Sequence, residues 1–124
     1  MAIDEQELAR QVAGNTSAAA RTVYQLFARA NLPKELSPQF GGHGYIDREL
    51  RFVRDGRWYF AAVLNKSWVL WYFRRPAISE LGLNLDELVQ TFHSAELTSG
   101  GEVKVRVQDP MTAYAMLGWL FQNL

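Results

Sequence analysis

Apolar residues near the N-terminus return every three or four positions, which is the spacing of one helical face. Two such runs are separated at Gly14, and Pro33 follows the second run. We therefore expect residues 1–32 to form N-terminal helices. Residues 34–47 are rich in Pro and Gly, and this composition predicts a loop.

Between residues 49 and 73 the pattern changes to nearly continuous runs of aromatic and β-branched residues, which are typical of strands. Asp55-Gly56 and Asn65-Lys66 interrupt these runs as two-residue turn signals. The pattern predicts a three-stranded antiparallel meander, with strands over residues 49–54, 57–64 and 67–73.

The remainder of the chain predicts a helix, a strand and a second helix. Asn84 can cap the first helix, and in residues 102–107 valines alternate with charged residues as in a strand with one solvated face. Asp109-Pro110 marks the start of the closing helix. Its expected buried stripe consists of Tyr114, Leu117, Leu120, Phe121 and Leu124. The expected fold class is α+β, an antiparallel β-sheet (the three-stranded meander plus a fourth strand) packed with N-terminal, middle and C-terminal helices.

If both turns hold two residues, both faces of the meander are apolar. One face carries Leu50, Phe52, Tyr59, Ala61, Val63, Trp68, Leu70 and Tyr72. The other carries Val53, Trp58, Phe60, Ala62, Leu64, Val69, Trp71 and Phe73. Such a sheet needs a cover on each side or a partner. The middle and C-terminal helices can cover one face and the N-terminal helices the other; otherwise one face is a ligand groove or a self-association surface.

The composition is that of a soluble globular protein, because 48% of the 124 residues are hydrophobic and 21% are charged. The absence of cysteine excludes disulfides and thiolate nucleophiles. The N-terminus is acidic without an apolar run, and no segment approaches the roughly 20 apolar residues that span a bilayer. We therefore expect a single cytoplasmic domain over residues 1–124, with no membrane partner.

The formal net charge is zero but is unevenly distributed. Residues 48–75 hold seven basic and two acidic side chains, whereas residues 76–124 hold two basic and six acidic ones. The basic segment also contains three of the four tryptophans. These charges either solvate the hairpin ends or form an anion-facing patch.

The candidate binding residues combine arginines with aromatic rings and a loop histidine. They are Arg54, Arg57, Trp58, Trp71, Arg74, Arg75 and His43. On the expected register Arg54 and Arg57 are directly opposite each other across the first turn. Two like charges there cost stability unless an anion or an acidic side chain lies between them.

Two classes of function fit these residues. In the first, the surface belongs to a non-catalytic binding or assembly module that self-associates or binds a protein partner. Acidic residues of a second copy would then complement the arginines, namely Glu80, Asp86, Glu87 and Glu96. In the second, exposed Trp58 or Trp71 stacks on bases and the arginines contact phosphates, as in a nucleic-acid-binding accessory domain.

A small hydrolase or nuclease-like enzyme is a third alternative. Glu102-Val103-Lys104 has the carboxylate and lysine spacing of PD-(D/E)xK nucleases, with Asp86 as the earlier acid. The same alternation is typical of any exposed strand face. No serine or cysteine nucleophile, phosphate loop or dinucleotide fingerprint is recognisable. We therefore assign no catalytic residue and no metal ligand, and we expect no cofactor.

Residues 44–124 contain a Tyr-Ile start, an aromatic hairpin of the "WYFAAVLNKSWVLWYF" kind and a closing "GGEVKVRVQDPMTAYAML". In these features the chain resembles a family of small domains of unknown function. Such domains are appended to some predicted restriction endonucleases and predicted transport proteins, and are distantly similar to the YdhG-like uncharacterised domains. The resemblance implies a compact α+β domain with an antiparallel sheet, and it brings no catalytic residues. Residues 1–43 lie outside it.

Overall fold

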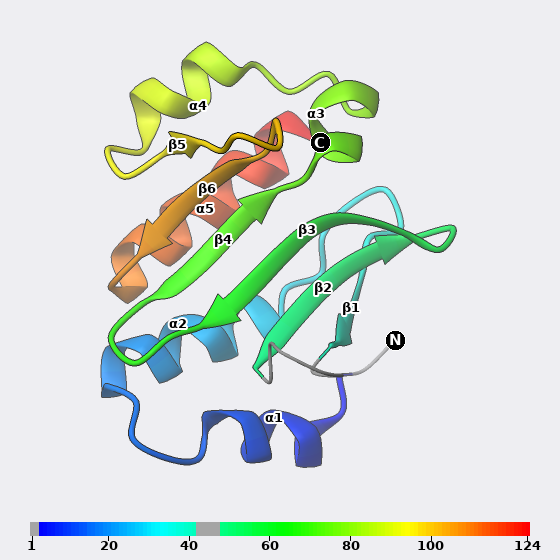
Figure 1. Cartoon of the computed structure of the whole chain (residues 1–124). Coiled ribbons are helices and arrows are strands. Elements are labelled where there is room, and N and C mark those ends of the chain that lie inside the picture. The colour runs from blue at the N-terminus through cyan, green and yellow to red at the C-terminus, as the bar shows by residue number, and fades with distance from the viewer. Residues whose placement is uncertain (1–2, 42–47) are drawn as a thin grey trace.

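The protein is represented by a computed structural model that describes residues 3–41 and 48–124 (Figure 1). Within these residues five helices and six strands form a helix layer against one sheet. In chain order the elements are α1 (Glu5–Val12), α2 (Ala18–Ala28), β1 (Ser37–Phe40), β2 (Glu49–Arg54), β3 (Arg57–Leu64), β4 (Val69–Phe73), α3 (Arg75–Glu80), α4 (Leu85–Thr91), β5 (Glu96–Leu97), β6 (Val103–Val107) and α5 (Pro110–Asn123).

The strands form one antiparallel sheet in the order β1-β2-β3-β4-β6-β5. The predicted meander is β2, β3 and β4, and the predicted fourth strand is β6, which pairs with β4. The α+β class with an antiparallel sheet is therefore confirmed. The predicted caps also form, because the side chains of Asn84 and Asp109 accept hydrogen bonds from the first turns of α4 and α5.

The sequence pattern does not predict three short elements, namely β1, α3 and β5. The loop prediction for residues 34–47 is wrong over Ser37–Phe40, which pairs with β2 as an edge strand. Pro38 is compatible with that position because an edge strand can leave one side of its backbone unpaired. These elements are two to six residues long, which is too short for a periodic pattern to develop.

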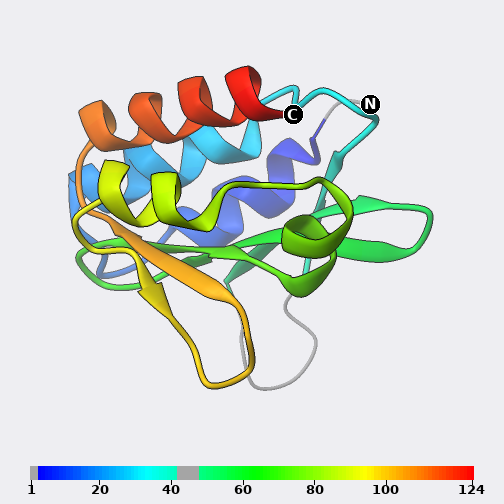
Figure 2. The same cartoon turned by 90° about the horizontal axis from the view of Figure 1, so that it is seen from above.

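Helices α2 and α5 lie side by side on the same face of the sheet (Figure 2). The ring of Phe27 in α2 is 4.7 Å from Trp71, and the ring of Trp119 in α5 is 5.8 Å from Phe73. Trp71 and Phe73 are two positions apart on β4 and so point to one face. The sequence leaves open whether the N-terminal helices cover the opposite face, and α2 instead covers the same face as α5.

The width of the sheet explains why one face takes both helices. Six strands about 4.8 Å apart span roughly 24 Å, whereas a helix with its side chains is about 10 Å across. Helix α5 alone would leave apolar positions of β2 and β3 uncovered, and α2 fills that space. Helix α4 packs beside α5, where the indole N–H of Trp119 donates a hydrogen bond to Glu87 at 3.3 Å.

The turn between β2 and β3 has the predicted two residues, Asp55 and Gly56, both with positive φ as a type I′ turn requires. The register nevertheless shifts by one residue between Phe52 and Val53. Val53 pairs with Trp58, and Phe52 pairs with Phe60, so one residue of β3 is left without a partner. This is a β-bulge.

The bulge corrects the predicted distribution of side chains over the two faces. Phe52 and Phe60 now point to the same face, and both are fully buried against the helices. The predicted face was wrong for Leu50, Phe52, Val53 and Trp58. The physical reason is that the shift buries both phenylalanines and leaves half-buried Trp58 on the other side of the sheet.

The apolar stripe predicted for α5 is only partly correct. Leu120 is buried and Leu117 is half-buried, but Tyr114 and Phe121 are 61% and 52% exposed. The packed face of α5 instead includes Ala113, Met116 and Trp119. In the described part of the chain no helix is both long and apolar enough to cross a membrane.

Candidate functional site

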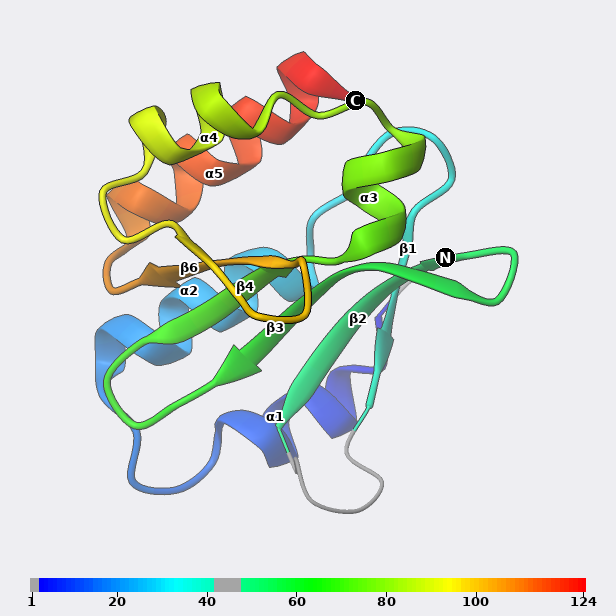
Figure 3. The same ribbon diagram turned by 45° about the horizontal axis from the view of Figure 1, so that its top comes forward.

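The candidate site lies on the sheet face that points away from α2 and α5, called here the open face (Figure 3). Two rows of directly paired residues cross it. The first row is Arg51, Ala61, Tyr72, Lys104 and Glu96. The second row is Glu49, Val63, Leu70 and Arg106. The middle of each row is apolar or aromatic and the ends are charged, so the open face is an apolar strip with a polar rim.

A hollow of about 280 Å³ lies on this face. Its lining residues are Glu49, Trp58, Ala61, Val63, Tyr72, Arg74 and Glu102. Three strands of the meander and the start of β6 therefore contribute to one concave surface. The β5–β6 hairpin projects from the sheet on the same side (Figure 2).

Two guanidinium groups contact the ring of Trp58. The guanidinium carbon of Arg51 is 3.4 Å from the ring centroid, and that of Arg74 is 4.8 Å from it. Such cation–π contacts hold a large ring in one orientation. Trp58 is thus a fixed wall of the hollow, and its ring already has cationic partners from its own chain.

Both of these arginines are also paired with carboxylates. Arg51 forms an ion pair with Glu49, and Arg74 forms one with Glu102 at 2.8 Å. The Glu49 side chain is only 8% exposed, so screening by solvent is weak there. Gly41 allows this packing, because a Cβ at that position would lie 2.6 Å from a Glu49 oxygen. The rim of the hollow therefore has two charges of each sign and no net charge.

Tyr72 lines the same hollow as these groups. Burial raises the pKa of Tyr72 above its ordinary value, and the negative charges of Glu102 and Glu49 raise it further. The hydroxyl is therefore protonated at neutral pH. It suits a hydrogen-bond donor better than a nucleophile or a base.

A second tryptophan–arginine contact lies at the other end of the strip. The guanidinium carbon of Arg106 is 4.1 Å from the ring centroid of Trp68. Trp68 directly precedes β4, and Leu70 and Tyr72 follow it at alternate positions along the strand, so the three side chains share the open face. The apolar strip is thus bordered by an aromatic–arginine contact at each end.

Of the predicted site residues, Trp58 and Arg74 come together at the hollow. Trp71 does not, because it is fully buried on the helix-covered face between Phe27 and Phe60. The prediction of Trp71 as an exposed stacking residue is wrong. The regular alternation of β4 sends it inward, opposite to Tyr72.

Arg54 and Arg57 are directly opposite each other at the β2–β3 turn, as predicted. Arg57 forms an ion pair with Glu80 of α3 at 2.7 Å. Arg54 donates a hydrogen bond to the hydroxyl of Tyr59 at 3.2 Å, and this bond raises the pKa of Arg54. The required acidic side chain therefore comes from the same chain, so these two arginines need no external anion.

The remaining predicted site residues are Arg75 and His43. Arg75 is exposed at the start of α3, beside Gly101 of the β5–β6 hairpin. His43 lies outside the described residues.

Sequence reasoning did not assign Glu49, Tyr72 and Glu102 to the site. In the sequence, each of the three is a polar residue that alternates with large apolar residues. Glu102, for example, directly precedes β6 and alternates with its valines, as Lys104 and Arg106 do within the strand. That signal identifies a solvated face but does not tell which strands lie beside each other. The lateral pairing is what brings the three side chains to one hollow.

The nuclease alternative gains no support from this geometry. Glu102 is paired with Arg74, and Lys104 is 4.0 Å from Glu96. Asp86 lies in the first turn of α4 and is exposed. Among residues 3–41 and 48–124, no three histidine or acidic side chains are grouped so that they could hold a metal ion.

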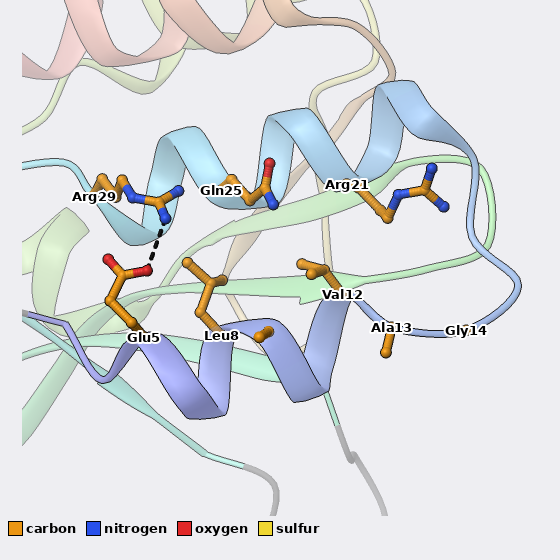
Figure 4. A pocket seen from close by; sticks show the side chains of 9 residues that line it. Glu5, Leu8, Val12, Ala13, Gly14, Arg21, Gln25 and Arg29 are labelled. Carbon is orange, nitrogen blue, oxygen red and sulfur yellow. Dashed lines mark hydrogen bonds and ion pairs between the residues drawn. The ribbon is translucent and has the colours of Figure 1, made fainter.

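A larger hollow of about 430 Å³ lies between α1 and α2 (Figure 4). Two arginines that line it are bonded to other groups of the N-terminal region. Arg29 pairs with Glu5 at 2.8 Å, and Arg21 donates to the carbonyl of Thr16 at 2.6 Å. The floor is formed by Leu8 and Val12 of α1. We interpret this groove as the seam between two helices, since its charged groups serve that contact.

Comparison of the chain with protein-family models, with curated proteins and with solved structures gives no match.

Proposed function

We propose that the protein is a non-catalytic binding module that holds an apolar side chain of a protein partner on the open face of its sheet. The observation that carries the proposal is the hollow between Trp58, Val63 and Tyr72, with its ring of paired charges. Trp, Tyr and Arg are the residues most enriched at the energetic centres of protein interfaces.

The size of the hollow favours a side chain over a larger ligand. Pockets for drug-sized molecules measure about 300–1,000 Å³. The hollow of about 280 Å³ lies just below that range. A single leucine or phenylalanine side chain of a partner is the better fit.

The charges favour a protein over a polyanion. Binding to nucleic acid depends on arginines and lysines that are free to neutralise phosphates. At this hollow Arg51 and Arg74 are both paired with glutamates, and both contact Trp58. A base that stacked on Trp58 would have to displace them.

The test uses capped single amino acids as side-chain probes, followed by NMR. We expect N-acetyl-leucinamide and N-acetyl-phenylalaninamide to shift the indole signal of Trp58 and the methyl signals of Val63. With about 0.3 kcal/mol per heavy atom, probes of this size should bind with a Kd on the order of millimolar. The dinucleotide TpT should leave these signals unchanged.

Val63→Glu should abolish the shifts, because it places a charge in the apolar middle of the hollow. Gln90→Glu on the exposed side of α4 is the matched control and should retain them. Shifts caused by TpT alone would favour the nucleic-acid alternative and overturn the proposal. A lack of response at Trp58 and Val63 to every apolar probe would also overturn it.

A further inference from the structure

Helix α5 has an outer face that packs against no other described element. The helix contains no charged residue over its 14 positions. On the outer face Met111 is 82% exposed, Tyr114 61% and Phe121 52%. Ala115, Gly118 and Gln122 are exposed between and beside them. A helix of a soluble monomer normally presents charged residues at such positions, so a stripe of this kind marks an interaction surface.

Gly118 in the middle of this face is not required by the fold of a single chain. A Cβ added there would meet no atom within 4 Å. Glycine in a helix interior is less stable than alanine, and no turn or internal contact requires it here. A second helix that approaches from outside would require it, because a missing side chain allows two backbones to come close.

We propose that the outer face of α5 is a homodimer interface, in which α5 of a second copy crosses it antiparallel at Gly118. A crossing at that residue places Ala115 of one helix opposite Phe121 of the other, so a small side chain meets a large one twice. This is the self-complementarity that a two-fold interface requires. A charged partner would find no complement on α5, whereas a second copy brings an equally uncharged surface.

The available area indicates a weak dimer. The exposed parts of Met111, Tyr114 and Phe121 amount to on the order of 400 Å² per copy, if a large side chain buries about 200 Å² in full. A stable dimer needs about 800 Å² per copy. The rest would come from flanking positions of α2, where exposed Ala19 and Thr22 also carry no charge. We therefore expect a dimer that forms only at micromolar or higher concentration.

The interface is independent of the proposed partner site. The open face and the outer face of α5 lie on opposite sides of the molecule (Figure 2). A dimer through α5 leaves both open faces accessible and makes the module bivalent. Loss of the dimer should therefore leave binding at the open face intact, and loss of that binding should leave the dimer intact.

Sedimentation equilibrium from low micromolar to millimolar concentration tests the interface. The wild type should show a reversible monomer–dimer equilibrium, and Tyr114→Glu should remain monomeric because it would place two carboxylates in the interface. Gly118→Ala should weaken the dimer by about tenfold or more, because an added methyl overpacks the crossing. The same variant should raise the Tm of the monomer by a few degrees.

Two variants distinguish association through α5 from association through another surface. Ser99→Glu, in the exposed β5–β6 connection, should leave the dimer unchanged. Val63→Glu, on the open face, should leave it unchanged as well. A wild type that stays monomeric at millimolar concentration would overturn the proposal. It would also be overturned by a dimer that Val63→Glu disrupts and Tyr114→Glu does not, since that dimer would use the open face.

Discussion

Arg57 and Glu80 form an ion pair at 2.7 Å that joins the β2–β3 turn to α3. The pair compensates one of two like charges, because Arg54 stands directly opposite Arg57. Glu80 also accepts a hydrogen bond from Tyr59 at 3.5 Å, and Tyr59 in turn accepts one from Arg54. One carboxylate therefore serves both arginines of the turn.

Without the Glu80 carboxylate, the repulsion between Arg54 and Arg57 should destabilise the folded protein. We expect Glu80→Gln to lower the free energy of unfolding by about 0.5–1 kcal/mol, a modest loss because the pair is partly exposed. In that background Arg57→Gln should be neutral or stabilising, whereas in the wild type it should be destabilising. Urea unfolding of the double-mutant cycle measures the coupling.

The salt dependence of stability gives a second test of the contacts among Arg54, Arg57 and Glu80. Added salt should recover part of the stability lost in Glu80→Gln, since it screens the two arginines. Glu5→Gln breaks the exposed pair with Arg29, which lies at the end of α2 and is not paired across strands with another arginine, so salt should recover less of that loss. Equal salt responses of the two variants would contradict the role given to Glu80.

The two tryptophans of the candidate surface should respond very differently to truncation. Trp71 is buried among Phe27, Phe52 and Phe60, so Trp71→Ala should cost about 3–5 kcal/mol of unfolding free energy. Trp58→Ala should cost about 1 kcal/mol, which corresponds to its cation–π contacts at the surface. Chemical denaturation of both variants measures the difference.

Trp71→Phe provides a milder test of the same position. The indole N–H of Trp71 is buried without a hydrogen-bond partner in the described structure. The substitution therefore breaks no hydrogen bond, and it lowers the free energy of unfolding only because the phenyl ring is smaller than the indole. A cost for Trp71→Phe close to that of Trp71→Ala would mean that the N–H has a partner.

Local chemistry in the sequence predicts the ends of elements well. Asp55-Gly56 specifies the type I′ turn, and this turn alone sets Arg54 opposite Arg57. The bulge three residues later could not be predicted, because it depends on whether both Phe52 and Phe60 find space against α2. The turn determines which residues pair only as far as such a shift. Here the shift is what places Trp58 on the open face.

The location of the open face was also beyond the sequence. Each N-terminal helix has an apolar stripe that fits either side of an apolar sheet, so the pattern leaves the choice open. The choice follows from the width of the sheet and from contacts such as Phe27 with Trp71. Trp71 is therefore a residue whose type suggests a binding surface but whose position on β4 buries it against the helices.

Tyr24 should make the protein lose stability at alkaline pH. Its ring is fully buried, its hydroxyl donates to Gln11, and burial raises its pKa far above the ordinary value. Above about pH 10 the unfolded chain releases this proton but the folded chain retains it. The free energy of unfolding should then fall by about 1.4 kcal/mol per pH unit from this group.

Urea unfolding between neutral pH and pH 11 measures this slope. Tyr24→Phe should be less stable at neutral pH, because the bond to Gln11 is lost, but should have a shallower slope above pH 10. An unchanged slope in Tyr24→Phe would show that Tyr24 does not set the alkaline limit.

Tyr72 reports on the electrostatics of the hollow. Its pKa is raised first by burial and then by the charges of Glu102 and Glu49. Glu102→Gln should therefore lower the pKa of Tyr72 towards the ordinary value, and the unpaired charge of Arg74 should lower it further. NMR titration of protein labelled at the tyrosine ring carbons measures the change.

Glu96→Gln, on the neighbouring strand and paired with Lys104, should have a smaller effect. If the two variants shift the pKa of Tyr72 equally, the Arg74–Glu102 pair does not set the potential in the hollow, and a partner would meet a surface governed by burial alone.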